Sequence, residues 1–459
     1  MRYSGTGTCA LVRGRANQGR ELETNYPKPS VAWACVAVLV MAYALSFVDR
    51  LILTLLVEPI RQDLQLNDVQ ISLLQGFSFA LFYSLAGIPL GRLVDSGRRT
   101  TIIAVGIALW SFMTAACGLS QRYWQLFIAR AGVGVGEATL GPAAYSLLSD
   151  LFPPGQRGLA LGIFSTGTSL GAGFALLIGG WLVGVVAAAG AVDVPGIGQL
   201  QPWQLTLIYV GLPGLLVALL VTLLPEPVRQ PDPSLATSTA AVPLGQLIAH
   251  YRQHAWTIGS IHLATGLAGM GSYGIMSWTP AMLMRVHGWS AQEVGLLVGG
   301  SILVAGTIGV VSGGWLADHL VRRGRRTGRL IAATASMAIG AVGAVAYPMQ
   351  ADPVLIAACL MVAMLGGFMA VGCSAAGLLA VVPNRMRGQV SAMFFLTNSL
   401  LGIGAGPVVV ALFTDFVFGT PVAVRYSLLV VPPAAYLLSA AVFWAGRRPY
   451  RASVAAAGA

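Results

Sequence analysis

Three ionisable side chains lie inside stretches of apolar residues: Asp49, Arg130 and Glu137. A charged group at the centre of a bilayer costs roughly 2.5–3.5 kcal/mol on insertion scales, so such groups are rare and usually functional. An arginine placed between two carboxylates lowers the cost of burying each of them. A partly desolvated carboxylic acid can take up a proton on one side of a membrane and release it on the other. The three residues therefore predict coupling between a proton and a second ligand.

Counting along the apolar stretches places the three groups at adjoining depths. Arg130 and Glu137 are two helical turns apart on one face, with Glu137 near mid-depth and Arg130 nearer the outer surface. Asp49 falls between them, slightly outside the midplane. We expect Asp49 and Glu137 to accept protons, and Arg130 to switch between them and an anionic ligand. Alternatively, Arg130 and Glu137 only brace the bundle, while Asp49 caps the outer end of its helix beside Arg50. We expect Arg50 to extend outward to the membrane surface.

The composition indicates that a bilayer is the solvent of this chain. Of its 459 residues 56% are hydrophobic and only 9% are charged, whereas soluble domains carry about 25% charged residues. The net charge of +11 does not indicate a nucleic-acid partner, because the arginines lie mainly in short loops between apolar stretches.

The cysteines and histidines show no pattern of a metal or catalytic centre. The five cysteines share no ligand-like spacing and the five histidines are scattered. We therefore expect no metal, no cofactor other than a coupling proton, and no enzymatic activity.

Apolar stretches of about 20 residues, separated by Pro, Gly or charged residues, predict twelve membrane-spanning helices. Helices are favoured over strands because the stretches have no period of two and because a helix satisfies its own backbone in lipid. The expected spans lie near 31–57, 69–91, 100–119, 124–148, 158–185, 204–224, 255–284, 291–317, 329–348, 353–382, 387–414 and 424–446.

The basic residues orient these spans. With the N-terminus inside, the inner segments hold 21 of the 27 Lys and Arg residues, so both termini are expected in the cytoplasm. The predicted organisation is a tail, a six-helix bundle, a Pro-, Ser- and Thr-rich linker, a second six-helix bundle and a second tail, at residues 1–30, 31–224, 225–254, 255–446 and 447–459. The end of the linker, PLGQLIAHYRQH, is expected to form a short amphipathic helix.

The two halves repeat a motif after their second span. The first half has GRLVDSGRR and the second has GWLADHLVRRGRR, each with a Gly, an Asp four residues later and a Gly-Arg-Arg ending. Each Asp sits where it can accept from arginines and from a neighbouring helix N-terminus. We expect these residues to latch the inner ends together in one state, although the arginines could also act only as topology signals. The predicted latch consists of Gly91, Asp95, Arg98, Arg99, Gly314, Asp318, Arg325 and Arg326.

These motifs resemble those of the major facilitator superfamily, as does FIARAGVGVGEATLGP in the fourth span. The segment after Asp95 departs from the family pattern, since Ser96 stands where Arg or Lys is usual. Asp49, Glu137, WTPAMLMRVHGWS and VPNRMRGQVSAMFF are most similar to Spinster-like transporters. The resemblance implies two six-helix bundles in pseudo-twofold relation, transport by alternating access, and a lysolipid or sphingoid-like substrate.

Few other polar side chains lie inside the spans, which favours an amphipathic or largely apolar substrate. Candidates to line a central cavity are Tyr43, Ser46, Tyr273, Trp278 and Asn398, each equally compatible with helix packing. A multidrug or small organic-anion carrier remains an alternative, as does a passive channel or a transporter-derived sensor. We expect a monomer surrounded by membrane lipid in the cell (inner) membrane of a bacterium.

Overall fold

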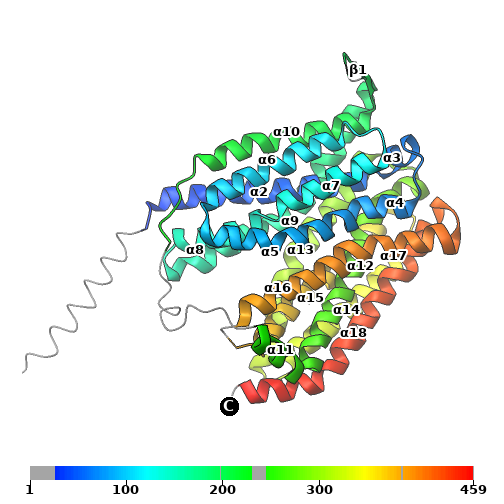
Figure 1. Cartoon of the computed structure of the whole chain (residues 1–459). Coiled ribbons are helices and arrows are strands. Elements are labelled where there is room, and N and C mark those ends of the chain that lie inside the picture. The colour runs from blue at the N-terminus through cyan, green and yellow to red at the C-terminus, as the bar shows by residue number, and fades with distance from the viewer. Residues whose placement is uncertain (1–25, 197, 230–243, 384–385, 458–459) are drawn as a thin grey trace, which may run out of the picture.

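The computed structural model describes residues 26–196, 198–229, 244–383 and 386–457. These residues form two groups of long helices that lie side by side (Figure 1). A short antiparallel hairpin, β1 (Val192–Val194) and β2 (Gly198–Leu200), projects from one end. Most of the predicted N-terminal tail and the middle of the predicted linker lie outside the described residues.

The first group is the N-terminal bundle. Its helices, including a π-helical turn η1, are α2 (Pro29–Leu55), α3 (Val57–Asp63), α4 (Asp68–Ser72), η1 (Leu73–Phe77), α5 (Ser78–Ser96), α6 (Arg99–Cys117), α7 (Tyr123–Glu137), α8 (Leu140–Leu151), α9 (Pro154–Ala189) and α10 (Pro202–Thr222).

The second group is the C-terminal bundle, which contains two π-helical turns, η4 and η5, and two 3₁₀ turns, η2 and η6. Its elements are α11 (Leu244–Gln253), α12 (Ala255–His287), α13 (Ala291–Arg322), α14 (Gly328–Ala346), η2 (Tyr347–Met349), α15 (Pro353–Leu379), α16 (Arg387–Asn398), η4 (Ser399–Ala405), α17 (Gly406–Leu412), η5 (Phe413–Phe418), η6 (Pro421–Ala423) and α18 (Val424–Ala457). Helix α11 confirms the short helix predicted at the end of the linker.

The twelve predicted spans are all helical. Ten segments of the described chain are long and apolar enough to cross a membrane. The other two are α12 and the stretch 124–148, which is divided between α7 and α8. This division follows from Pro142, which lacks the N–H that would bond to the carbonyl of Ala138 in a continuous helix. The break comes directly after Glu137 and so ends α7 at a charged side chain.

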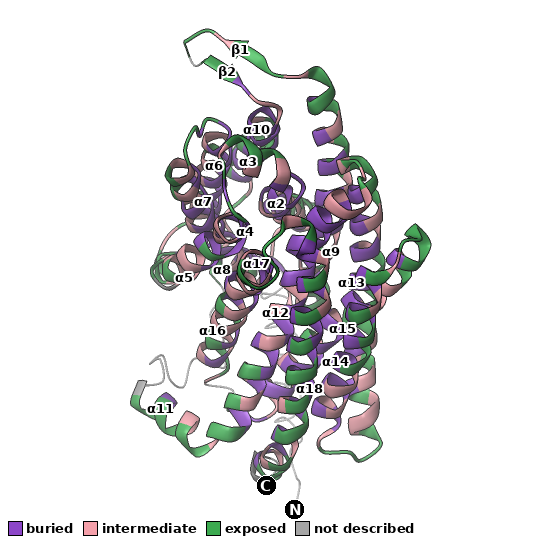
Figure 2. Cartoon of the chain, turned by 90° about the vertical axis from the view of Figure 1, so that its right-hand side faces the viewer, coloured by how far each residue is buried: buried purple, intermediate pink, exposed green. Residues whose placement is uncertain are grey.

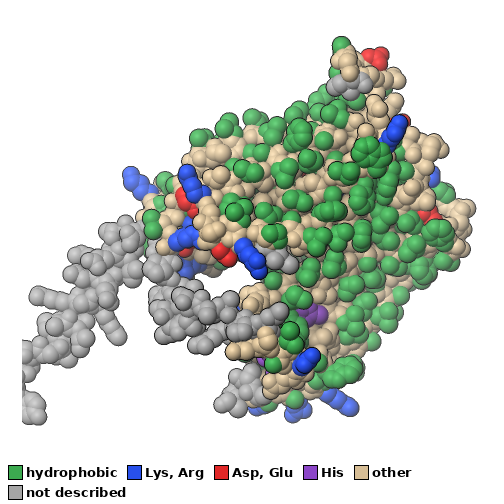
Figure 3. All heavy atoms as spheres, viewed as in Figure 1, with side chains coloured by type: hydrophobic (Ala, Val, Ile, Leu, Met, Phe, Trp, Pro, Cys, Tyr) green, Lys and Arg blue, Asp and Glu red, His purple; other side chains and the backbone are tan. Residues whose placement is uncertain are grey.

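The outward sides of the helices are apolar. Figure 2 shows buried residues where helices face one another and exposed residues on the sides that face away. Hydrophobic side chains cover most of the face seen in Figure 3, while Lys and Arg gather mainly toward the end where α8 and the C-terminus lie. This distribution suits a protein whose middle is surrounded by lipid and whose arginine-rich end is cytoplasmic.

The two bundles meet at their outer halves and separate toward the inner end. Helix α13 packs closely against the part of α9 between Ser169 and Gly180. A Cβ added at Gly295 or Gly299 of α13 would overlap the backbone of α9. Nearer the inner end of α9, a Cβ at Gly162 would meet nothing within 4 Å. Figure 1 shows the two bundles spread apart at the end where α8 and α11 lie, and we call this arrangement inward-open.

The segment that follows α10 is fastened to the N-terminal bundle. Arg229 donates to the backbone carbonyls of Val94 and Asp95 at the end of α5 and of Gly97 directly after it. Glu226 accepts from Arg99 Nε at 2.7 Å. The first residues of the predicted linker thus pack as part of the first bundle.

Candidate functional site

Asp49 and Arg50 are consecutive residues on α2 and therefore project about 100° apart around the helix. The side chain of Asp49 is turned toward Trp110 and Thr114 of α6, and the residue is only 2% exposed. Its Oδ1 is buried without a hydrogen-bond partner. A buried polar atom without a hydrogen-bond partner costs free energy, so Asp49 is an unusual residue in this helix.

Arg50 pairs with the carboxylate of Glu137. Its Nη2 donates to Glu137 Oε2 at 2.5 Å, and the two side chains are 12% and 1% exposed. Three aromatic rings surround the guanidinium, with centroids 4.8 Å (Phe47), 4.3 Å (Phe79) and 5.9 Å (Tyr83) from its Cζ. Cation–π attraction to these rings and the ion pair together hold a charge deep in the bundle.

Arg130 binds backbone rather than a carboxylate. Its Nη1 donates to the carbonyl oxygen of Asp49 at 3.0 Å, and its Nε donates to that of Leu74 at 3.4 Å. Leu74 belongs to η1, where the π-helical turn departs from regular α-helical pairing. Arg130 is fully buried and ties α7 to α2 and η1.

The structure therefore brings Asp49, Arg130 and Glu137 into one bundle, as predicted, but gives Glu137 a different partner. The expectation that Arg50 extends outward is wrong. Arg50 lies five residues before α2 ends at Leu55, at nearly the depth of Asp49, so its shortest path to a charge partner runs inward. The equal depth of Asp49 and Arg50 was readable from the sequence, but which of the two side chains faces Glu137 was not.

The Arg50–Glu137 pair borders the contact between the two bundles. A void of about 10 Å³, close to the room that one water needs, lies beside Arg50. Residues of both bundles line it: Arg50, Leu51, Thr54, Gln75 and Gly76 from the first, and Tyr273, Met276, Ser277 and Ile403 from the second. A change in the charge of the Arg50–Glu137 pair therefore changes the electrostatic potential at the residues of the second bundle that line this void.

The remaining predicted cavity residues differ in their surroundings. Tyr273 borders the void, whereas Ser46 is buried and donates to the carbonyl of Tyr43. Trp278 is fully buried and donates to the carbonyl of Pro407 at 2.9 Å, so it packs helices in this conformation. Asn398 is half-buried with its Oδ1 unpartnered.

The aspartates of the predicted inner latch are apart from its arginines in this conformation. Asp95 and Asp318 are both exposed, and among the described residues no ion pair joins either of them to an arginine. The exposed arginines of the predicted latch are Arg98, Arg325 and Arg326. A Cβ at Gly91 or Gly314 would meet nothing within 4 Å, consistent with inner ends that stand apart.

Arg99 differs from the other predicted latch arginines because it is fully buried. It forms ion pairs with Asp150 at the inner end of α8 and with Glu226 after α10. These contacts lie within the first bundle, so Arg99 joins helices of that bundle in the inward-open state.

A second ion-pair cluster at the outer end was missed by sequence reasoning. Arg285, at the end of α12, binds Asp68 of α4 through two bonds of 2.6 and 2.7 Å and Glu58 of α3 through one of 2.5 Å. Nearby, the backbone N–H of Val69 donates to Asp415 Oδ2 at 2.8 Å. We call Arg285, Glu58 and Asp68 the outer gate, because they join the two bundles at the closed end.

Within the described residues no group of three or more His, Cys, Asp or Glu is arranged to hold a metal ion. The chemistry that the site offers is therefore that of two buried carboxyl groups and two buried arginines.

Comparison with known proteins agrees with this geometry. The family model described as Major Facilitator Superfamily matches residues 39–453. The chain belongs to the Major Facilitator Superfamily. This assignment confirms the family predicted from the loop motifs.

Two relatives of this superfamily member cover different shares of its length. An "MFS-type efflux pump" of Mycolicibacterium smegmatis is 30% identical over 93% of this chain and 95% of its own length. "Protein spinster" of Drosophila melanogaster is 26% identical over 63% of this chain and 46% of its own length.

Among solved structures, a bacterial homologue of the human lysosomal transporter Spinster, in an inward-facing and unoccupied conformation, superposes with a TM-score of 0.75. It is 25% identical over 94% of this chain and 98% of that one. The predicted twelve-helix fold and the Spinster-like resemblance are confirmed. The protein is a multi-pass membrane transporter of this superfamily.

Proposed function

We propose that this protein is a proton-coupled transporter that moves an amphipathic, lipid-like small molecule by alternating access. The observation that carries the proposal is the Arg50–Glu137 ion pair beside the buried carboxyl of Asp49, whose Oδ1 has no hydrogen-bond partner. Two acids and one mobile cation at the border between the bundles are the parts that proton coupling requires.

The arrangement supports a specific exchange. When Glu137 is ionised, its carboxylate holds Arg50 in the first bundle. Protonation of Glu137 removes the negative charge and leaves the guanidinium of Arg50 free to face an anionic group of a substrate beside Tyr273. Asp49 directly precedes Arg50 in α2 and provides a second acid that can accept the proton or pass it on. The anionic group of the substrate and the ionised carboxylate of Glu137 compete for Arg50. Binding of the substrate is therefore linked to the protonation of Glu137.

We propose that Arg130 holds the backbone around Asp49 in place during this exchange. Its bonds to the carbonyls of Asp49 and Leu74 fix the backbone that carries the acid, and its charge favours the ionised form of nearby carboxylates. Its predicted role as the direct partner of a substrate anion stays a prediction, since in this conformation the side chain is fully buried.

The substrate class rests on the scarcity of polar side chains in the spans and on the resemblance to Spinster-like proteins. A second candidate is supported by the relatives: besides the efflux pump, a "Hexuronate transporter" of Bacillus subtilis is 25% identical over 64% of this chain. Export of small apolar compounds and carriage of small organic anions are therefore the alternatives to test. We propose a monomer in the inner membrane of a bacterium as the working form.

The test is uptake by the purified full chain in liposomes. Lysophosphatidylethanolamine, sphingosine 1-phosphate and glucuronate, each of which carries an anionic group, are offered as labelled substrates with and without an imposed pH gradient. We expect a saturable, gradient-driven flux of one of the two lipids. Gradient-driven flux of glucuronate alone would replace the lipid assignment by the organic-anion one, and flux indifferent to the gradient would refute proton coupling.

Two variants connect this flux to the site. Asp49→Asn and Glu137→Gln should each remove the gradient-driven component while leaving a folded, monodisperse protein. Asp193→Asn removes a carboxylate from the exposed hairpin and serves as the matched control, which should transport like the parent. If both site variants keep the full response to the gradient, neither acid carries the coupling proton.

A further inference from the structure

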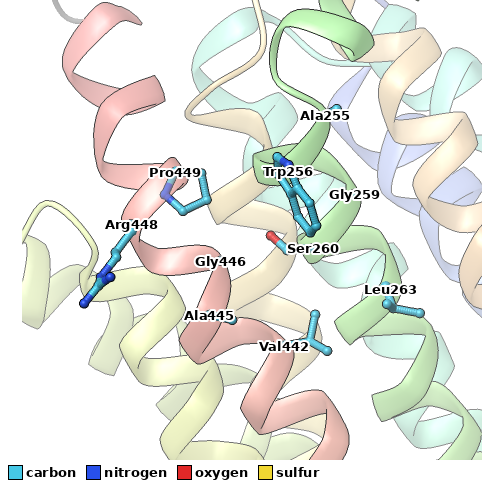
Figure 4. Close-up of a pocket in the computed structure, with 10 residues that line it drawn as sticks. All are labelled: Ala255, Trp256, Gly259, Ser260, Leu263, Val442, Ala445, Gly446, Arg448 and Pro449. Atoms are coloured by element: carbon cyan, nitrogen blue, oxygen red, sulfur yellow. The ribbon is translucent and has the colours of Figure 1, made fainter.

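An apolar groove lies between the first turns of α12 and the inner part of α18. It has a volume of about 870 Å³, which falls within the roughly 300–1,000 Å³ typical of small-ligand sites. Figure 4 shows Trp256 and Ser260 of α12, and Val442 and Pro449 of α18, pointing into the space between the two helices. Because both helices belong to the C-terminal bundle, the groove is separate from the Arg50–Glu137 site.

The floor and walls of the groove are shaped by two glycines. A Cβ at Gly446 would overlap the hydroxyl of Ser260, so the helices touch closely at this level. A Cβ at Gly259 would meet nothing within 4 Å, so this exposed position opens into free space. The lining is otherwise formed mainly by apolar side chains, including Leu263 and Val442. Such a channel on the outside of a helix pair fits a hydrocarbon chain.

The inner rim of the groove is positively charged. Arg448 is one of the residues that line the groove, and its guanidinium lies on the side of α18 that faces away from α12 (Figure 4). Arg447 and Arg451 on α18 and Arg252 on α11 carry further charges, while α11, α12 and α18 contain no Asp or Glu. Uncompensated arginines at the inner surface attract anionic lipid head groups by about 1 kcal/mol each.

Trp256 marks the level of the membrane surface. It begins the first turn of α12 and is 81% exposed. Tryptophan is enriched where hydrocarbon meets head groups. The apolar part of the groove, which runs from Trp256 toward Leu263, therefore lies below the head-group level.

We propose that this groove binds one anionic phospholipid of the inner leaflet, with an acyl chain between α12 and α18 and the phosphate among the arginines at the inner end of α18, which are Arg447, Arg448 and Arg451. The occupant is a phospholipid because the apolar channel and the cationic rim are joined. A free anion would use only the rim, and an uncharged apolar compound would use only the channel.

The probe is phospholipid brominated in its acyl chains, which quenches the fluorescence of a tryptophan in contact with it. The purified full chain is placed in phosphatidylcholine vesicles, and brominated phosphatidylglycerol or brominated phosphatidylcholine is added in rising mole fraction. The contribution of Trp256 is the difference between the parent and Trp256→Phe. We expect this component to be quenched at a lower mole fraction of brominated phosphatidylglycerol than of brominated phosphatidylcholine.

Two variants test the two ends of the site. Arg448→Gln should raise the phosphatidylglycerol fraction needed for half-quenching about fivefold, as loss of one surface arginine predicts. Arg323→Gln removes an exposed arginine at the inner end of α13 and should change nothing. Gly259→Leu fills the groove without a backbone clash and should abolish the preference for phosphatidylglycerol.

Gly300→Leu is the matched control for the filled groove. Gly300 shares the outward stripe of α13 with Leu296 and Val304, and a Cβ there would also meet nothing within 4 Å. It should keep the preference. The proposal is overturned if the two brominated lipids quench Trp256 equally in the parent, or if the preference survives in both Arg448→Gln and Gly259→Leu.

Discussion

Arg285 at the outer end of α12 holds both carboxylate oxygens of Asp68 in α4, at 2.6 and 2.7 Å. The two side chains are 4% and 1% exposed. They belong to different bundles, so the pair must break when the outer ends part. Its free energy therefore bears directly on the equilibrium between the inward-open and outward-open states.

Asp68→Asn should shift the protein toward the outward-open state. Removing one partner of a buried ion pair costs about 3–5 kcal/mol, and moving a population from 1:99 to 99:1 requires about 5.5 kcal/mol. The distance between spin labels at Gln62 in α3 and Thr420 before η6, both exposed, measures the opening in a background without native cysteines. We expect a longer-distance component to appear.

Glu293→Gln is the matched control for this measurement. Glu293 is an exposed acid near the outer surface whose side chain contacts only Ser290, at the cap of its own helix. Its removal should leave the distance distribution as in the parent. An unchanged distribution in Asp68→Asn would mean that the outer gate does not set the balance between states.

Gly76→Ala should weaken the same closed end by a steric route. Gly76 lies in η1, and an added Cβ would overlap the backbone carbonyl of Ile403 in η4 of the other bundle. Because backbone cannot move aside as a flexible side chain does, the two π-helical turns must separate. The Gln62–Thr420 labels should report a longer distance, whereas Gly87→Ala, where a Cβ meets nothing within 4 Å, should not change it.

The sequence predicted the spans, the duplication and the buried acids, because each depends on local composition or on a repeated motif. It did not predict the partner of Glu137, since Arg50 and Asp49 differ by one position and only the packing of α2 shows which faces inward. The sequence did not predict the contacts of the outer gate either. Arg285 is 217 residues from Asp68, and each of these residues taken alone resembles an ordinary loop charge.

Asp95→Asn tests the inner latch. The side chain is exposed and forms no ion pair within the described chain, as expected if the latch closes only when the inner ends meet. We propose that the substitution destabilises the outward-open state and so raises the inward-open population. Labels at Gln156 in α9 and Met393 in α16, both exposed, should lose their shorter-distance component. Asp193→Asn should retain it, and retention in Asp95→Asn would contradict the latch.

Glu226 gives the N-terminal bundle a pH-dependent contact. Partial burial alone would raise the pKa of Glu226, but hydrogen bonds from the Thr100 backbone N–H and from Arg99 outweigh it and lower the pKa. A lowered folded-state pKa means stability that is complete above the ordinary glutamate value of about 4.3 and is lost as the pH falls below it.

The unfolding temperature in detergent should therefore drop between pH 5 and acid pH by more in the parent than in Glu226→Gln. Gln keeps the shape of the side chain and has no charge to titrate. Asp193→Asn removes a carboxylate from the exposed hairpin and controls for acid effects elsewhere in the chain. Parallel pH curves for the parent and Glu226→Gln would show that this contact does not stabilise the bundle.

Arg50→Lys and Arg130→Lys should have different effects, the first mainly on gradient-driven flux and the second mainly on the unfolding temperature. Arg50 pairs through a single Nη2 contact with Glu137, so Arg50→Lys keeps the charge but changes its reach, and gradient-driven flux should fall about tenfold or more, because coupling needs precise geometry. Arg130 joins two backbone carbonyls through separate nitrogens, a fork that lysine cannot reproduce. Arg130→Lys should therefore lower the unfolding temperature more than Arg50→Lys does. Measuring flux per folded molecule separates the two, and equal losses of stability and flux in both variants would refute the division of roles.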